Sequence, residues 1–275
     1  MKTEIVCQVR IAALVLLVAA SMVPEALFAG EFAAIISPPR FELQGKPGEK
    51  VREVVQIGNA GNDIGEYVLR TADWDLNKEG GIIIHPEALQ PGSCRPWVRI
   101  ERRRLKLPPG GRKNYRFEVH IPPDAPAGEC RFAILVAPPP EADIFAEMGD
   151  IRFPIAGQIA IVVYVGVGDA KPNLQFQEVR LQEVDGRPVP VAVFHNAGNA
   201  HGRPAGLLEA EDANGQLLDL VVSPSPILPG ATRAIPLWPA DIEDSDKAVA
   251  FKMPMKLKGP IEWDGGSINI DAVLE

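Results

Sequence analysis

The sequence has few of the residues on which most catalytic and metal sites depend. Among its 275 residues there are 3 cysteines and 4 histidines. None of the histidines has a spacing typical of metal ligands, and neither G-x-S-x-G nor a phosphate-binding glycine loop occurs. Asp73 and Asp75 fall on one face of a predicted strand, but no other site feature accompanies them. The sequence therefore predicts no enzyme, no metal and no other cofactor.

Long hydrophobic runs are also missing after the N-terminus. The first residues combine Lys2 and Arg10 with an apolar run of thirteen and a small residue, Ala29, at a plausible cleavage point. This is the layout of a secretory signal peptide, and the run is too short to span a bilayer as a helix. We expect residues 1–29 to be removed, and the mature chain to lie in the periplasm without an integral membrane segment.

Positive charge is scarce relative to negative charge. The net charge is -8, which argues against nucleic acid as a partner. One stretch, RPWVRIERRRLK at residues 95–106, runs against this balance. It is either a charged edge strand that resists aggregation or a patch for an acidic client or a membrane lipid.

Two of the three cysteines remain after the signal peptide is removed. Cys94 and Cys130 are disulfide candidates, because an exported protein matures in an oxidising compartment. The alternative is a pair of buried or reduced thiols. A bridge would close a loop of about 36 residues and stabilise the fold by roughly 3–4 kcal/mol.

Sustained helical periodicity is absent, and strand patterns replace it. Prolines number 27 and glycines 25, and both are spread along the chain. Short apolar runs recur between turn residues, and residues 114–121 alternate strictly between apolar and polar side chains. Residues 151–165 give the longest strand candidate, and residues 138–150 are predicted to be a loop. The pattern predicts an all-β protein made of β-sandwiches.

The tetrapeptide NAGN occurs twice, at residues 59–62 and at residues 196–199. Each copy follows an apolar strand, and each is followed later by a proline-glycine turn, LPPGG at 107–111 and LPG at 228–230. Asparagine and glycine both tolerate left-handed backbone, so NAGN is predicted to be a turn without chemistry. The repeat indicates two tandem sandwich domains, residues 30–168 and residues 169–275.

Three stretches resemble the PapD-like periplasmic chaperones of pilus assembly. They are ISPPRFELQGKPGEKVREVVQIGNAGN, LKLPPGGRKNYRFEVHIPPDAPAGECRFAILV and GQIAIVVYVGVG. They are similar to the family's opening strand pair, to its leucine-proline-glycine turn with the strands that follow, and to the last strand of its first domain. The resemblance implies two immunoglobulin-like domains.

The resemblance also implies a function. Members of this family bind pilus subunits that lack one strand, and they lend a strand of their own to fill the gap. The corresponding strand here is residues 151–165. Its alternating side chains Ile155, Ile159, Ile161 and Val163 are the implied contacts with a pilin-like or other surface-fibre subunit; the other reading makes this an ordinary core strand.

The family also anchors the carboxylate of the subunit with an arginine and a lysine. Arg40 falls on the arginine position, but the lysine position holds Ala160 or Ile161. Half of the anchor is therefore missing, which suggests a divergent chaperone; an outer-membrane usher is a further partner that the resemblance raises. The alternative is a structural or adhesive cell-envelope protein that lends no strand.

Overall fold

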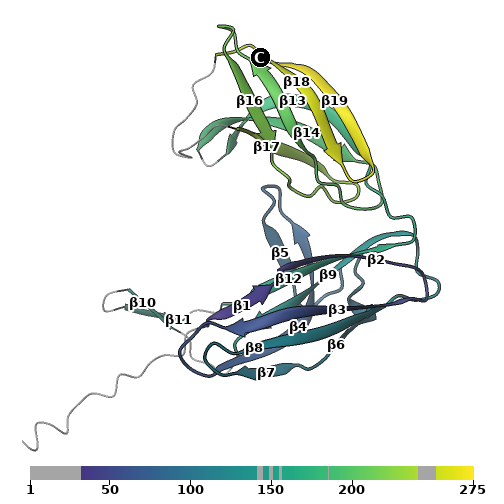
Figure 1. Cartoon of the computed structure of the whole chain (residues 1–275), viewed down its shortest axis with the longest axis vertical. Coiled ribbons are helices and arrows are strands. Elements are labelled where there is room, and N and C mark those ends of the chain that lie inside the picture. The colour runs from purple at the N-terminus through teal and green to yellow at the C-terminus, as the bar shows by residue number, and fades with distance from the viewer. Residues whose placement is uncertain (1–31, 141–144, 149–150, 155–156, 185, 241–251) are drawn as a thin grey trace, which may run out of the picture.

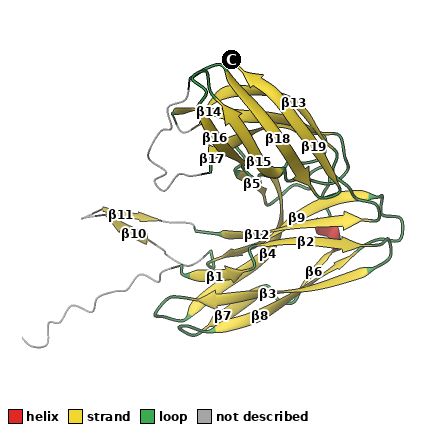
Figure 2. Ribbon diagram, turned by 45° about the horizontal axis from the view of Figure 1, so that its top comes forward, coloured by secondary structure: helices red, strands yellow, loops and turns green. Residues whose placement is uncertain are grey.

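The computed structural model describes residues 32–140, 145–148, 151–154, 157–184, 186–240 and 252–275. They form two domains made of strands, as Figures 1 and 2 show. This confirms the predicted all-β class with two tandem sandwiches. The predicted signal peptide lies outside the described residues. Within the described part of the chain, no helix is long and apolar enough to cross a membrane.

The first domain contains two main sheets and a separate hairpin. One sheet has the order β1-β3-β8-β6; the other has the order β2-β12-β9-β4-β5, with β7 also paired to β4; β10 and β11 form the hairpin. The strands are β1 (Ala34–Ser37), β2 (Arg40–Gly45), β3 (Lys50–Asn59), β4 (Gly65–Leu76), β5 (Ile82–His85), β6 (Val98–Ile100), β7 (Arg104–Leu107), β8 (Arg112–His120), β9 (Gly128–Ala137), β10 (Phe145–Met148), β11 (Ile151–Pro154) and β12 (Ile159–Val167). A short 3-10 helix, η1 (Arg95–Trp97), precedes β6.

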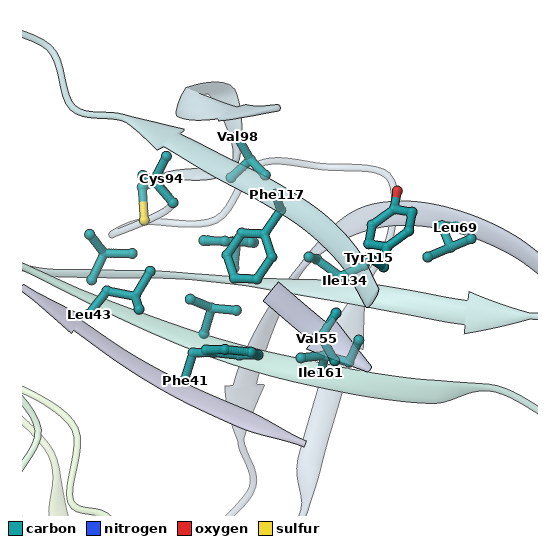
Figure 3. Close-up of a cluster of buried hydrophobic side chains, with 14 of the residues drawn as sticks. Phe41, Leu43, Val55, Leu69, Cys94, Val98, Tyr115, Phe117, Ile134 and Ile161 are labelled. Carbon is teal, nitrogen blue, oxygen red and sulfur yellow. The ribbon is translucent and has the colours of Figure 1, made fainter. Parts of the chain in front are cut away.

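The core of the first domain lies between its two sheets. Alternate side chains of β8, including Tyr115 and Phe117, point inward and are buried. They meet Phe41 and Ile161 from the facing sheet, as Figure 3 shows. The Phe41 and Phe117 rings meet edge to face, with their centroids 5.2 Å apart. The period-2 pattern of the sequence thus becomes the inner face of a sandwich.

The second domain is a single antiparallel sheet of seven strands in the order β13-β14-β17-β16-β15-β18-β19. The sheet curls until β13 and β19 come into contact, which encloses a core that includes Phe194, Leu220 and Leu257. The strands are β13 (Leu174–Val184), β14 (Arg187–Asn196), β15 (Ala205–Glu211), β16 (Leu217–Val222), β17 (Thr232–Pro239), β18 (Met255–Trp263) and β19 (Gly266–Leu274).

The first asparagine of each NAGN copy makes equivalent hydrogen bonds, at the ends of β3 and β14. The side-chain Nδ2 of Asn59 donates to the carbonyl oxygens of Asp63 and Leu107, at 2.7 and 3.1 Å. The Nδ2 of Asn196 donates to those of Ala200 and Ile227, both at 2.8 Å. Each Oδ1 accepts the amide two residues later at 3.0 Å. Both asparagines are buried, so each is a structural centre of its turn.

The proline-glycine turns close the same arrangement. Gly110 and Gly230, each preceded by proline, have φ of 65° and 74°, which glycine adopts without the steric cost that a Cβ brings. The residues after them, Gly111 and Ala231, offer carbonyl oxygens that accept the backbone amides of Asn59 and Asn196, both at 2.9 Å. Each asparagine therefore ties a strand end to a turn in the same way, as expected for a duplicated domain.

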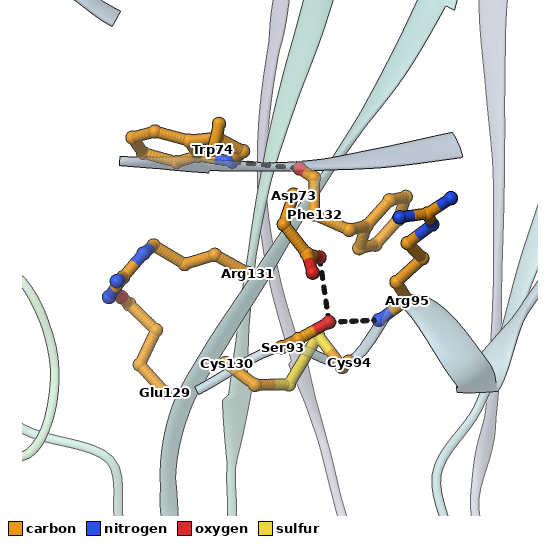
Figure 4. Close-up of a disulfide and its surroundings, with 9 residues drawn as sticks. All are labelled: Asp73, Trp74, Ser93, Cys94, Arg95, Glu129, Cys130, Arg131 and Phe132. Carbon is orange, nitrogen blue, oxygen red and sulfur yellow. Dashed lines mark hydrogen bonds and ion pairs between the residues drawn. A yellow bond between two sulfur atoms is a disulfide. The ribbon is translucent and has the colours of Figure 1, made fainter. Parts of the chain in front are cut away.

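Cys94 and Cys130 form a disulfide with their Cα atoms 5.4 Å apart, shown in Figure 4. It joins the residue before η1 to β9. Nearby, the buried carboxylate of Asp73 accepts the Ser93 hydroxyl at 2.7 Å and the amide of Gln90 at 2.8 Å. Asp73 therefore holds the loop beside the disulfide.

Two strand predictions were wrong. Residues 151–165 are not one strand: β11 pairs with β10 in the separate hairpin, and β12 begins only at Ile159 and belongs to the main sheet. The predicted loop at 138–150 contains β10. Alternating side chains look the same in a strand of the separate hairpin and in a strand of the main sheet. The sequence pattern alone therefore could not distinguish β11 from β12.

Candidate partner-binding site

The two edges of β12 are paired unequally. On one side, β12 pairs with β9 from Ile159 to Val167. On the other side, β2 pairs with it in parallel only from Val162, which lies opposite Arg40. The preceding Pro38 and Pro39 lack the amide hydrogens that would extend this ladder. Among the described residues, the edge of 159–161 on this side has no strand partner.

This open stretch leads toward the β10–β11 hairpin. Figures 1 and 2 both show the hairpin projecting beyond the body of the first domain, on the side where β12 begins. Strands β11 and β12 are separated by residues 155–158. The predicted contact Ile155 lies outside the described residues.

The predicted contact residues of β12 differ in exposure. Ile161 and Val163 are fully buried members of the first core, so the structure assigns them to the sandwich. They have no exposed surface with which to meet a partner. Ile159 is only partly buried and sits at the open end of the strand. Of the β12 contacts predicted from sequence that the structure describes, Ile159 is therefore the one that keeps exposed surface.

Arg40 lies at the junction of the two domains, and its guanidinium is already engaged. Its Nε lies 3.0 Å from Oε1 of Glu42, and its side chain is 51% exposed. The same oxygen lies 3.4 Å from Nε of Arg203, which comes from the second domain. The second cation beside Glu42 is thus an arginine from the other domain. Glu42 lies between the two guanidinium groups.

His201 forms a close polar contact between the domains. Its Nδ1 lies 2.5 Å from Oε2 of Glu129 on β9, and its Nε2 lies 3.6 Å from Glu42. Its ring stacks on Tyr164 of β12 with the centroids 3.9 Å apart. The Glu129 amide also donates to the carbonyl oxygen of Asn199 at 2.7 Å. The turn formed by the second NAGN is therefore fastened to β9.

Tyr164 is the centre of this junction. Its ring meets Trp74 edge to face with the centroids 5.0 Å apart, and its hydroxyl lies 3.3 Å from Nη2 of Arg203. Burial raises the pKa of the Tyr164 hydroxyl, which stays protonated at neutral pH. Arg203 therefore donates to a neutral hydroxyl, and its ion-pair partner at this junction is Glu42.

A cleft of 1190 Å³ opens between the domains beside this junction. Trp74 and Arg131 line it from the first domain, and Arg233 lines it from the second. The Arg131 guanidinium lies 5.6 Å from the Trp74 ring centroid. Burial lowers the pKa of the Arg233 guanidinium, which donates to the carbonyl oxygen of Pro226 at 2.7 Å. In the described ranges, no cluster of three or more His, Cys, Asp or Glu could hold a metal ion.

The sequence did not point to Glu42, Glu129, His201 or Arg203. These residues come together only through the packing of the two domains, and no local motif records that packing. One signal was present: His201 and Arg203 lie just after the second NAGN, in the connection between β14 and β15.

Replacing His201 with alanine is expected to loosen the junction. The amide of Glu129 reports on it directly, because its acceptor, Asn199, lies in the other domain. We expect hydrogen exchange at this amide to quicken about tenfold, the effect of losing roughly 1.4 kcal/mol of contact. Exchange at Ile134, in the middle of β9, should not change.

The matched control is His195→Ala. This histidine belongs to the same domain, and its Nδ1 lies 3.0 Å from Oγ1 of Thr232 on the neighbouring strand. It should leave the Glu129 amide as protected as in the wild type. Equal exchange rates in the two variants would contradict a role for His201 in fastening the domains.

Comparison with known proteins finds similar solved structures but no similar sequence families. No protein-family model matches it, and no curated protein matches it. Several solved fimbrial chaperones match it along most of its length. The Pseudomonas aeruginosa CupB2 chaperone is 13% identical with a TM-score of 0.44, covering 88% of this chain and 100% of its own. The E. coli chaperone DraB is 14% identical with a TM-score of 0.44, covering 89% and 97%.

A third match is a complex. The CsuC-CsuE chaperone-tip adhesion subunit pre-assembly complex, from the archaic chaperone-usher Csu pili of Acinetobacter baumannii, contains a chain that is 12% identical with a TM-score of 0.44. The match covers 88% of the present chain and 99% of that chain.

Proposed function

We propose that the mature chain is a periplasmic chaperone-like protein that caps surface-fibre subunits by strand addition. The observation that carries the proposal is the open edge of β12 at residues 159–161. These residues come before Val162, where the pairing with β2 begins. An unpaired strand edge offers backbone donors and acceptors to another chain. An added strand would continue the sheet there.

The local sequence suits strand addition. Residues on both sides of the open stretch are extended in the structure, in β11 and β12. Backbone hydrogen bonds would supply affinity, and alternate side chains such as Ile159 would fill apolar positions in the client. The proposal assigns no catalytic residue, metal or cofactor to this site.

The contribution of Arg40 is expected to be smaller than in a chaperone with a free arginine and lysine pair. The Glu42 carboxylate already forms ion pairs with Arg40 and Arg203. A client carboxylate would have to share the Arg40 guanidinium with Glu42, so it gains less net interaction. We therefore propose that the strand edge carries most of the affinity, and that Arg40 adds orientation.

Ile159→Asp is expected to abolish the capture of a subunit. A buried charge at an added strand cannot be accommodated by an apolar position in the client. The measurement is co-purification from periplasm of the full chain, expressed together with the neighbouring genes. Arg40→Ala should reduce the recovered subunit only a fewfold, because its guanidinium is shared with Glu42.

The matched control is Ile83→Asp, which places the same charge at an isoleucine 43% exposed on β5, the other edge of the same sheet. It should recover as much subunit as the wild type. Thermal melting of each variant separates lost binding from lost folding. If the wild type captures no subunit even with its neighbours co-expressed, the capping proposal fails, and the structural or adhesive alternative gains.

A further inference from the structure

The second domain carries a row of exposed apolar side chains on its outer face. Strands β15, β16 and β17 are neighbours in this domain, where Figure 2 labels them. Their register places Leu207 opposite Val221, and Val221 opposite Trp238. These residues, which we call the apolar row, are 45%, 42% and 42% exposed. The next residues along, Leu208 and Leu220, are buried in the core, so the apolar row is a separate, outward-facing surface.

Contacts within the sheet do not cover the apolar row. Cross-strand apolar pairs stabilise neighbouring strands, and Val221 has an apolar neighbour on each side. It is therefore paired on both sides, and its exposure is not a feature of an open sheet edge. More than two fifths of each residue in the row nevertheless stays in water. Large apolar side chains that are exposed together indicate a surface that another molecule covers.

Two carboxylates lie directly beside the apolar row. Glu209 follows Leu207 by two residues on β15, and Asp219 precedes Val221 by two residues on β16. The strand register places Glu209 and Asp219 opposite each other, and both are exposed. Like charges at directly opposite positions repel each other and weaken the pairing of the strands.

No cation of the protein neutralises this pair of carboxylates. Lys258 lies opposite Glu209 on the other neighbouring strand, β18, but its Nζ pairs with Asp271 at 3.3 Å. Among the residues that the structure describes, Glu209 and Asp219 make no ion pair. Their repulsion is therefore not relieved within the protein, and a cation from another molecule would relieve it.

A hollow of 620 Å³ opens beside Leu207, where the pairing of β15 with β18 is interrupted. Leu207 and Pro260 give it apolar surface, and Glu209 and Glu262 give it carboxylates. Lys258 also lines the hollow, but its charge is already engaged in an ion pair. The hollow thus suits a side chain that is apolar along its length and positively charged at its end.

We propose that this face docks a segment of a partner protein that presents arginine beside large apolar side chains. The apolar row receives the apolar side chains, and Glu209 and Asp219 receive the guanidinium groups. Arginine fits better than lysine for two reasons. Its planar fork binds carboxylates through pairs of hydrogen bonds, and it stacks on aromatic rings such as that of Trp238.

The charge of the face selects against other occupants of an apolar surface. A second copy of the chain, paired about a two-fold axis at this face, would bring acids against acids. An anionic membrane surface would be repelled for the same reason. The face belongs to β15, β16, β17 and β18 and shares no residue with the open edge of β12, so the inference is independent of the proposed function.

The test uses the full mature chain and a labelled peptide of repeated Arg-Leu-Ser. Binding is measured by fluorescence anisotropy at low and at physiological salt. Trp238→Ala should weaken binding about tenfold at either salt, because it removes apolar and ring contacts. Glu209→Gln/Asp219→Asn should weaken binding about fivefold at low salt, and the difference should shrink as salt rises. A Lys-Leu-Ser peptide should bind the wild type more weakly than the arginine peptide.

Folding and net charge are controlled separately. Thermal melting shows whether each variant is folded. Glu209→Gln/Asp219→Asn removes a repulsion between neighbouring strands, so it should melt at or above the wild-type temperature, and its weaker binding then reports on the surface alone. Asp124→Asn/Glu183→Gln removes the same charge at two other exposed positions and should bind the peptide like the wild type.

Any of three results would overturn the proposal. The first is equal weakening by the two charge-removing double variants, which would show only an effect of net charge. The second is absence of binding of the arginine peptide to the wild type at low salt. The third is self-association of the wild type that analytical ultracentrifugation detects and that Trp238→Ala abolishes, which would make the face a contact between copies of this chain.

Discussion

Replacing Asn59 with alanine is expected to lower the free energy of unfolding by about 3 kcal/mol. The side chain is 3% exposed. It satisfies the carbonyl oxygens of Asp63 and Leu107 and the amide of Gly61. Removing it leaves these backbone groups without partners in a site that water reaches poorly, which costs more than the loss of the bonds themselves. Urea denaturation of the full chain measures the difference.

The control lies in the same tetrapeptide. Asn62 is exposed, so Asn62→Ala should change the stability by less than about 0.5 kcal/mol. The equivalent change in the second domain, Asn196→Ala, should cost at least as much as Asn59→Ala, because Asn196 is fully buried and its Oδ1 also accepts the amide of Asn173 at 3.1 Å. If Asn59→Ala and Asn62→Ala are equally mild, the asparagines are not structural centres.

Removing the disulfide is expected to have the largest single effect on stability. Cys94 and Cys130 are separated by 36 residues, and a cross-link over such a loop stabilises by about 4 kcal/mol by restricting the unfolded chain. Cys94→Ala/Cys130→Ala should therefore shift the urea midpoint strongly downward. The wild type with a reductant should shift in the same direction.

The reductant also provides the control. It should have no effect on Cys94→Ala/Cys130→Ala, which has no bond to lose. The contrary result is a fall in the unfolding free energy of less than about 1 kcal/mol, in the double variant or on reduction. That result would show that the unfolded chain is already restricted, and it would contradict the expected stabilisation by the disulfide.

Much of the fold could be predicted because it depends on local sequence patterns, namely strand alternation and turn motifs. Alternation along residues 114–121 marked β8 and its inward side chains, and the repeated NAGN marked two equivalent strand ends. The pattern at residues 151–165 misled for a physical reason. Alternation shows that one side of a strand meets apolar surroundings, but not whether they belong to its own domain.

The site was harder to predict, since it depends on contacts between distant segments. Arg40 was found through the resemblance, and its neighbour Glu42 is only two residues away. The engagement of Glu42 by Arg203 and His201 depends on how the second domain sits against the first. Such packing leaves no periodic signal in the sequence.

Under the proposed function, the position of Glu42 would also set an order of events. Because it is tethered beside Arg40, its effective concentration there is of millimolar order or higher, whereas a client arrives from dilute solution. A free carboxylate at micromolar concentration would lose this competition. A client already held along β12 would compete on equal terms, since its own carboxylate would then be tethered as well. Under the proposed function, Glu42 acts as an internal competitor that admits the arginine contact only after the strand has docked.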